Sequence, residues 1–199
     1  MANNLTTEKA RCTWVPLNDP LYVHYHDQEW GVPVHNDQTL FEFLILEGMQ
    51  AGLSWKTILH KREHYRNSFY NFDPLKVARF SDADIAKLLE NVTLVRNRLK
   101  IEATVKNAKA FLKIQEKYGS FDQFLWQFTE GKTIHTYHRK GMKLPASSKL
   151  SETISCELKQ NGMKFVGPII VYSFLQAIGI INDHEVECFR FNDLISSKI

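Results

Sequence analysis

The sequence contains few of the residues on which secreted and strand-rich proteins depend. Its 199 residues include only three cysteines and no CxxC pair, which excludes a complete disulfide framework. We therefore expect thiols that stay free or bind metal in a reducing compartment. Nine glycines and six prolines are too few for an architecture of many short strands and turns. These absences favour a cytoplasmic, mostly helical protein.

Long apolar runs are also missing. The first ten residues, MANNLTTEKA, do not contain the apolar core of a signal peptide. The most hydrophobic stretch, residues 165–181, is interrupted by small, cyclic or polar residues: Gly167, Pro168, Ser173 and Gln176. Such a stretch is typical of a buried helix and not of a membrane span, so we expect no membrane partner.

Composition and charge indicate an ordinary globular protein. Hydrophobic residues make up 44% and charged residues 24% of the chain, and the net charge of +3 permits a polyanionic partner without requiring one. At this length we expect a single domain over residues 1–199, with flexible tails at 1–10 and 190–199. No pattern suggests a coiled coil or a swapped arm, so we expect a monomer.

Helical periodicity and helix-capping residues dominate the pattern, and strand-like alternation is scarce, so the predicted fold class is all-α. The predicted helices cover residues 36–52, 54–67, 82–90, 97–118, 120–129, 148–160 and 168–177. Residues 131–148, which include Lys, His, Gly and Pro, are the best candidate for an internal loop.

Glu47 is an isolated acid in an apolar helix. Its neighbours one and two turns away include four apolar residues: Leu40, Phe43, Leu44 and Ala51. No Lys or Arg lies within one turn, and a buried carboxylate is costly unless it finds a partner or faces a pocket. Two interpretations remain open, a buried acid that accepts backbone donors and a functional acid at a pocket.

Aromatic residues are concentrated in the segments around Glu47 and near the N-terminus. They are Trp14, Tyr22, Tyr25, Trp30 and Trp55. Such rings usually pack in a core, but beside a buried acid they can form the walls of a pocket that stacks a planar cation.

A possible metal site is divided between the two ends of the chain. Cys12 and His26 lie near the start, and His184 and Cys188 are four residues apart near the end, which is a spacing that shares one helix face. Together they would form a closed Cys2His2 set, which leaves no coordination position for water. Alternatively, each is a buried thiol or a satisfied imidazole. Cys156 is interpreted as a core thiol.

The segment LKQNGMKFVGP predicts a short hairpin between two helices. Gly162 suits the position just after the first helix, Gly167 permits close approach, and Pro168 suits the first turn of the second helix. The N–H groups at that helix start, with Lys164, could bind a phosphate. The alternative is a joint that binds no ligand.

These motifs together resemble the DNA-3-methyladenine glycosylase I family. The matching blocks, from about Arg11 to about Cys188, are RCxW, DPLYxxYHDxEWGVP, LFExLxLEGxQAGLSWxTIL and KFVGPxxxYSFLQAxGxxNDHxxxC. The resemblance implies a helix-hairpin-helix glycosylase bundle, one structural Zn²⁺ per chain, and double-stranded DNA with alkylated bases as the partner. It also implies excision of 3-methyladenine, with an abasic site left in the DNA.

The resemblance also assigns site residues by position. The zinc ligands are Cys12, His26, His184 and Cys188, and the acid that recognises the damaged base is Glu47. The base-pocket positions are Tyr22, Tyr25 and Trp55, supported by Trp14 and Trp30. The DNA-binding positions are Gln50, Gly52 and Leu53 in a loop that probes the gap, and Gly162, Lys164 and Gly167 in the hairpin. Met49 and Ile169 depart from the polar residues common in relatives.

Two further sequence features bear on the reaction. Asp183 is the nearest candidate for an acid that assists attack on the sugar, but support of the neighbouring zinc ligand is an equal alternative. Pro168, Ile169 and Ile170 follow the hairpin, where bifunctional relatives carry a Schiff-base lysine, so no lyase step is expected. The competing functions are a non-catalytic DNA-binding module and a zinc hydrolase with an open coordination position.

Overall fold

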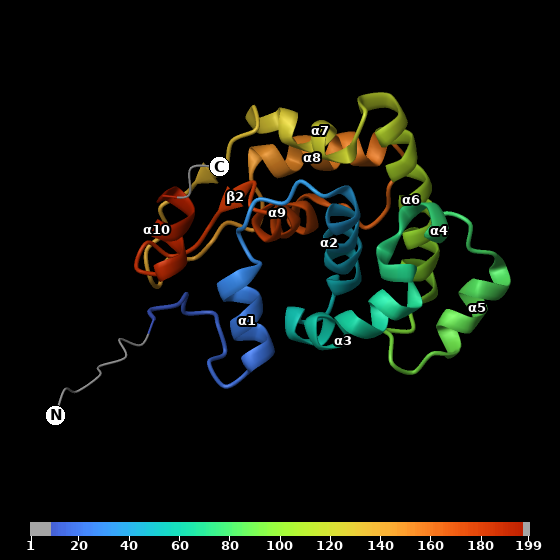
Figure 1. Cartoon of the computed structure of the whole chain (residues 1–199), viewed down its shortest axis with the longest axis horizontal. Helices are drawn as coiled ribbons and strands as arrows, with labels where there is room; N and C mark the ends of the chain where they lie inside the picture. Colours follow the sequence, from blue (N-terminus) through green and yellow to red (C-terminus); the bar gives the residue numbers. More distant parts are fainter. Residues whose placement is uncertain (1–8, 197–199) are drawn as a thin grey trace.

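The computed structural model describes residues 9–196, and the central element of this part is the helix α2 (Asp37–Gln50; Figure 1). Asn36 caps its start, because the side chain accepts a hydrogen bond from the N–H of Thr39 at 3.0 Å. Every residue from Leu40 to Met49 is buried, so α2 is covered on all sides. The predicted buried helix is thereby confirmed.

The other elements surround α2. The helices are α1 (Pro20–Gln28), α3 (Trp55–Ser68), α4 (Pro74–Val77), α5 (Asp82–Glu90), α6 (Arg98–Tyr118), α7 (Phe121–Trp126), α8 (Lys149–Gln160), α9 (Pro168–Ala177) and α10 (Phe189–Ser196). Short 3₁₀ turns lie at Tyr70–Phe72 and Gln127–Thr129, and the two short strands are β1 (Ile134–His135) and β2 (Ile181–Asn182).

The arrangement places α2 and α9 in the middle of the molecule (Figure 1). Helices α4 and α5 lie at one end, α10 lies at the other, and α7 and α8 run along one edge. The core is mostly aliphatic and aromatic, and its largest fully buried rings include Tyr65, Phe41 and Phe111. Within residues 9–196, no helix is both long enough and apolar enough to cross a bilayer.

The mostly helical architecture confirms the predicted fold class, and the strongly capped helices match the sequence expectation closely. Ser81 and Ser148 each form a capping box at the start of α5 and α8, as the serine positions predicted. Helices α1 and α4 were missed. In α1 the apolar residues form no stripe, although Asp19 caps it by accepting from the N–H of Tyr22 at 3.3 Å.

Three expectations need correction. Residues 190–196 are not a loose tail but belong to α10, because Phe191 is buried against the rest of the molecule. The expected tail residues 1–8 and 197–199 lie outside the described part. The loop predicted at 131–148 contains β1, which pairs in parallel with β2, Ile134 opposite Ile181. Cys156 is exposed and not a core thiol, because it faces outward from α8.

Candidate functional site

A pocket of about 300 Å³ opens beside the end of α2. Its lining comes from four stretches of the chain, residues 14–30, 47–55, 144 and 173–176: Trp14, Tyr22, Tyr25, Trp30, Glu47, Gln50, Trp55, Leu144, Ser173 and Gln176. The predicted acid and all five predicted aromatic residues therefore surround a single hollow. The volume is at the lower end for small-molecule sites, and half of the lining residues are aromatic, with a few polar groups among the rest.

Glu47 is the only acidic residue of this lining. It is 4% exposed, and its carboxyl group makes no hydrogen bond and no ion pair with any residue in the described part of the chain. Burial away from water raises the pKa of Glu47 to about 8. The free carboxyl group is therefore mostly protonated at neutral pH and would ionise when a positive charge enters the pocket.

The aromatic walls have defined packing. Tyr25 and Trp55 lie with ring centroids 5.2 Å apart, and Trp14 meets Trp30 edge-on at 4.8 Å. The indole N–H of Trp55 is buried and has no hydrogen-bond partner among the residues that the structure describes. Burial, and then the nearby Glu47, raise the pKa of Tyr22 and of Tyr25. Both phenols are therefore neutral and can donate a hydrogen bond.

Three lining residues were not predicted as site residues: Leu144, Ser173 and Gln176. Ser173 and Gln176 come from α9, and their polarity within an otherwise apolar helix was the available signal. Leu144 comes from the segment between β1 and α8, whose sequence carries no signal for a pocket. The segment predicted as a loop thus contributes to the wall.

The four predicted metal ligands converge. One ligand atom from each of Cys12, His26, His184 and Cys188 lies within 4.8 Å of the other three, and all four residues are buried. The Sγ of Cys188 is 3.5 Å from Nε2 of His26 and 3.7 Å from Nδ1 of His184, and the Sγ of Cys12 is 3.4 Å from that Nδ1. Tetrahedral coordination of one ion by sulfur and nitrogen places such atoms roughly 3.5 Å apart. The donor set fits a metal ion.

The remaining imidazole nitrogens support this arrangement. Nδ1 of His26 lies 2.7 Å from Oδ1 of Asp27, and Nε2 of His184 lies 3.0 Å from the carbonyl oxygen of Trp30. When these nitrogens donate, the lone pairs of the other two face the cluster. Arg11 in turn donates to both oxygens of Asp27, at 2.9 and 3.0 Å from Nε.

The two thiols of this cluster are electrostatically linked. A hydrogen bond from Cys12 lowers the pKa of Cys188, which the His184 and His26 rings lower further, whereas the same bond and burial raise the pKa of Cys12. One sulfur can therefore carry a negative charge before any ion binds. Both must lose their protons to bind an ion, which makes binding pH-dependent.

Glycine is required at two positions that bring the N-terminal segment against this cluster. Gly31 has φ +80°, and a Cβ there would lie 3.0 Å from Nε2 of His184. Gly179 has φ +75°, and a Cβ there would lie 2.4 Å from the backbone nitrogen of Pro33. The segment that carries Trp30 can approach only because both residues lack a side chain.

The predicted hairpin joins α8 to α9. Gly162 has φ +88°, its N–H donates to Lys159, and the N–H of Met163 donates to Leu158, which closes the end of α8 as predicted. Asn107 on α6 fixes the loop, since its side chain accepts from the N–H of Lys164 at 2.8 Å and donates to its carbonyl oxygen at 2.9 Å.

The predicted probing loop follows α2. Gln50 lines the pocket, Gly52 has φ +77°, and Leu53 is 40% exposed. Lys100 on α6 is buried and donates to the carbonyl oxygens of Met49 and Ala51 at 2.7 and 2.5 Å. Both predicted DNA-contacting loops are therefore held by α6.

Asp183 lies outside the pocket lining, and its carboxylate makes no hydrogen bond to the ring of the neighbouring His184. Its carboxylate accepts hydrogen bonds from the hydroxyl of Tyr172 and the side-chain amide of Gln176, each at 2.6 Å, and from the hydroxyl of Thr136. Nε2 of His138 is 3.2 Å away. With these partners Asp183 is a structural hydrogen-bond acceptor, and its link to the pocket is the hydrogen bond from the lining residue Gln176.

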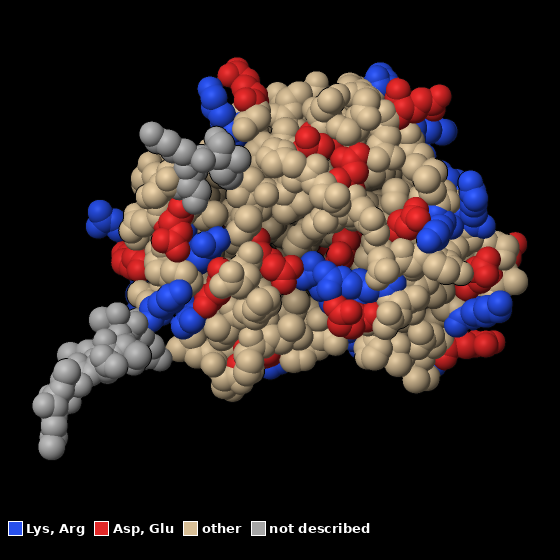
Figure 2. All heavy atoms as spheres, in the orientation of Figure 1, with Lys and Arg blue, Asp and Glu red and all other residues tan. Residues whose placement is uncertain are grey.

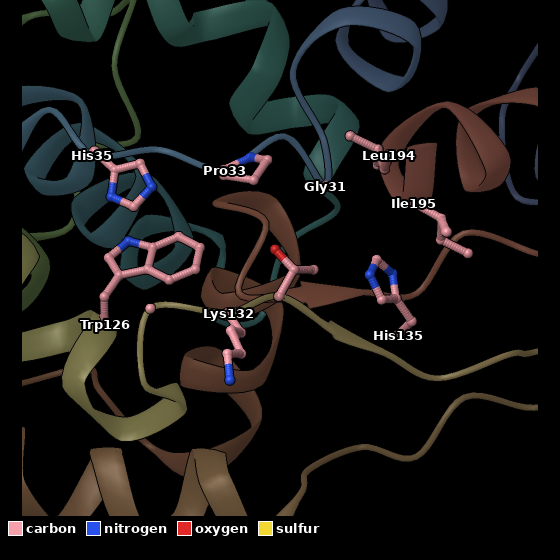
Figure 3. Close-up of a pocket in the computed structure, with 10 residues that line it drawn as sticks. Gly31, Pro33, His35, Trp126, Lys132, His135, Leu194 and Ile195 are labelled. Carbon is pink, nitrogen blue, oxygen red and sulfur yellow. The ribbon is translucent and has the colours of Figure 1, made fainter. Parts of the chain in front are cut away.

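A second hollow, of about 390 Å³, lies between the segment of residues 31–35 and α10 (Figure 3). His35 and Trp126 stack on one side of it, and Leu194, Ile195 and His135 lie toward the other. Nδ1 of His35 is already partnered by Asp122, and Nε1 of Trp126 by the carbonyl oxygen of Val34. This hollow has no acidic lining residue, so the smaller pocket is the candidate site.

On the face drawn in Figure 2, Lys and Arg side chains are interspersed with Asp and Glu and do not form one continuous stripe. The small net charge agrees with this distribution. The charges on this face therefore do not indicate where a polyanion would bind. The hairpin and the probing loop remain the specific candidates for contact with DNA.

Comparison with known proteins agrees with the geometry. A family model described as methyladenine glycosylase matches residues 14–191. The chain is 46% identical to DNA-3-methyladenine glycosylase 1 of Escherichia coli (strain K12) over 178 residues, which are 89% of this chain and 95% of that protein.

Two solved structures are also similar. A crystal structure of 3-methyladenine DNA glycosylase I has a TM-score of 0.87 and 46% identity, and the match covers 90% of this chain and 98% of that one. A variant of 3-methyladenine DNA glycosylase I in complex with 3-methyladenine has a TM-score of 0.84 and 41% identity, over 86% and 92% of the two chains.

Proposed function

Because this chain belongs to the methyladenine glycosylase family, we propose that it excises 3-methyladenine from alkylated double-stranded DNA. It hydrolyses the N-glycosidic bond and leaves an abasic site. The observation that carries this function is the buried, unpartnered carboxyl group of Glu47 among aromatic rings in a hollow of about 300 Å³. A flipped base needs such a site, where rings stack on its faces and polar groups meet its edge.

Selectivity follows from charge. Methylation at N3 gives the adenine of the nucleotide a positive charge, which also makes the base a good leaving group. A cation entering the pocket favours the ionised form of Glu47, whose pKa is about 8 in the free protein, whereas a neutral base leaves that carboxyl group protonated and buried. Stacking against Tyr25 and Trp55 adds cation–π attraction.

The chemical step needs little acid catalysis, since the base leaves as a neutral molecule. Water attacks C1′ of an oxocarbenium-like sugar after the bond to the base has weakened. No lysine follows the hairpin at Pro168, Ile169 or Ile170, so the proposed enzyme is monofunctional and has no lyase step. Asp183 is excluded from our mechanism as a water-activating base, because its oxygens are occupied by Tyr172, Gln176 and Thr136.

DNA engagement is assigned to the two loops braced by α6. We propose that Gln50, Gly52 and Leu53 probe the gap left by the extruded nucleotide. Gly162, Lys164 and Gly167 would contact the backbone of the DNA from a helix-hairpin-helix, with the N–H groups at the start of α9 facing a phosphate. The exposed apolar Leu53 supports the probing role.

The metal ion in this proposal is Zn²⁺, one per chain, held by Cys12, His26, His184 and Cys188. The sulfur and nitrogen donors and their separations support zinc. All four positions of a tetrahedral ion would be filled by protein, so it would link the chain ends and supply no water for catalysis. This argues against the alternative of a zinc hydrolase. We further propose a single-domain, monomeric, cytoplasmic protein.

Replacement of Glu47 by Gln tests the function. Incubation of Glu47→Gln with methylated DNA should release 3-methyladenine at least about 10-fold more slowly than the wild type, because the neutral amide cannot form a charge-assisted contact with the cation. Chromatography of the released bases measures this. The exposed Glu116 on α6 provides the control Glu116→Gln, which should retain full activity.

Affinity for DNA that contains an abasic site should stay the same in Glu47→Gln. Unchanged release of 3-methyladenine would remove Glu47 from the mechanism. DNA binding by the wild type without any base release would instead favour the non-catalytic binding module.

A further inference from the structure

Gln176 has an environment that fixes the orientation of its side-chain amide. The residue lines the pocket and is 8% exposed. Its Nε2 donates to Oδ2 of Asp183 at 2.6 Å, and the same oxygen accepts the hydroxyl of Tyr172 at 2.6 Å. Asp183 is itself 1% exposed and also accepts from Thr136, so it forms a rigid anchor behind the pocket wall.

Only one orientation of the amide satisfies this anchor. A carboxylate accepts hydrogen bonds and cannot donate them, so the nitrogen of the Gln176 amide must face Asp183. The carbonyl oxygen, Oε1, then lies at the opposite side of the amide. It makes no hydrogen bond with any residue in the described part of the chain. Since Gln176 lines the pocket, this free acceptor is within reach of a bound base.

We propose that Gln176 is a specificity-determining residue for position 6 of the purine, with Asp183 as its positioning residue. This inference rests on the proposed function. The exocyclic amine of 3-methyladenine is a donor and satisfies Oε1. Guanine and hypoxanthine carry an oxygen at position 6. This oxygen would face Oε1 of Gln176, and neither acceptor would have a donor. A ligand that leaves buried polar groups without hydrogen-bond partners is rejected more strongly than a ligand that only lacks a methyl group.

Two free bases test this assignment, namely 3-methyladenine, which carries an amine at position 6, and 3-methylhypoxanthine, which carries an oxygen there and a ring N–H. Titration calorimetry on the full chain should give the wild type at least about a 10-fold preference for 3-methyladenine. In Gln176→Met, which keeps the length of the side chain but has no amide, the preference should fall to within about 3-fold, mainly through weaker binding of 3-methyladenine.

A second variant tests the positioning role of Asp183. Asn at position 183 can both donate and accept, so in Asp183→Asn the amide of Gln176 can turn over and present its N–H₂ group to the pocket. The preference should then shrink or reverse. Thr136→Val, which removes a different donor to Asp183, should keep the wild-type preference. If Asp183 had a purely structural role, Asp183→Asn would weaken the binding of both bases in parallel and leave the ratio of the two affinities unchanged.

The outcomes separate this inference from the proposed function. Retention of the wild-type ratio in a folded Gln176→Met overturns the assignment, even when methylated DNA is still processed. A wild type that releases 3-methyladenine but binds the two bases equally also overturns it. A wild type that releases no 3-methyladenine at all would instead refute the proposed function.

Discussion

At the scale of single residues, the charge state of Glu47 links the pocket to the stability of the protein. Its pKa is raised from an ordinary value of 4.5 to about 8 by burial. Between these two values the group is protonated in the folded protein and ionised in the unfolded chain, so folding takes up a proton. The contribution of Glu47 to the free energy of unfolding is therefore fully present below about pH 4.5 and is lost as the pH rises toward 8.

Replacement of Glu47 by Gln removes this dependence. The free energy of unfolding of Glu47→Gln, relative to wild type, should increase from pH 5 to pH 8, by on the order of a few kcal/mol at about 1.4 kcal/mol per pKa unit. Denaturant unfolding at several pH values measures the difference. A difference that stays constant with pH would mean that Glu47 is ionised and stabilised in the free pocket.

The sequence alone could identify Glu47 but not Gln176. A carboxylate with apolar residues such as Phe43 and Leu44 one turn away either accepts buried donors or faces a pocket, and the family resemblance favoured the pocket. Gln176 was visible as a polar residue in an apolar stretch, but its meaning depends on Asp183, which meets it only after the chain has left α9 and turned into β2. A pair of residues that lie in different elements has no helical or strand spacing that a sequence pattern could detect.

At the scale of elements, α6 positions the two loops proposed to contact DNA. Lys100 and Asn107 are seven residues apart, which places them on one face of the helix. One holds the end of α2 and the other holds the hairpin. Burial lowers the pKa of Lys100, but its ammonium group meets two carbonyl oxygens at the C-terminal end of α2, where a positive charge is favourable.

Substitution of Lys100 by Met should remove both contacts and leave two carbonyl groups without a donor. We expect a loss of about 1–3 kcal/mol in the free energy of unfolding. Affinity for duplex DNA should also fall, because the probing loop loses its support. Urea denaturation and DNA titration measure these effects. The exposed Lys113 on the same helix provides the control, and Lys113→Met should change stability by less than about 0.5 kcal/mol.

Local signals explain which elements could be predicted. Helices with a serine or asparagine cap and an apolar stripe, such as α5 and α8, were predicted almost to the residue. Helix α10 and the pair of short strands are stabilised by contacts between distant segments, as in the pairing of Ile134 with Ile181. Such pairing exists only after the core has formed, so residue patterns do not report it.

At the scale of the whole molecule, the four Cys and His side chains bring the N-terminal segment and α1 against the segment between β2 and α10. Cys12→Ser or His184→Ala should lower the zinc content and the melting temperature together, since a metal bound only by the folded state stabilises it. The exposed Cys156 provides the matched control, and Cys156→Ser should change neither. Zinc content that remains at one per chain in both variants would refute the ligand assignment.

The joining of distant segments also has a consequence for synthesis on the ribosome. Trp14 and Trp30, which form one wall of the pocket, are translated before His184, which packs against Trp30. A nascent chain therefore cannot fix this wall of its pocket until His184 has been translated. Messages truncated before residue 184 should yield proteins in which these indoles stay open to solvent, however well the central helices have formed.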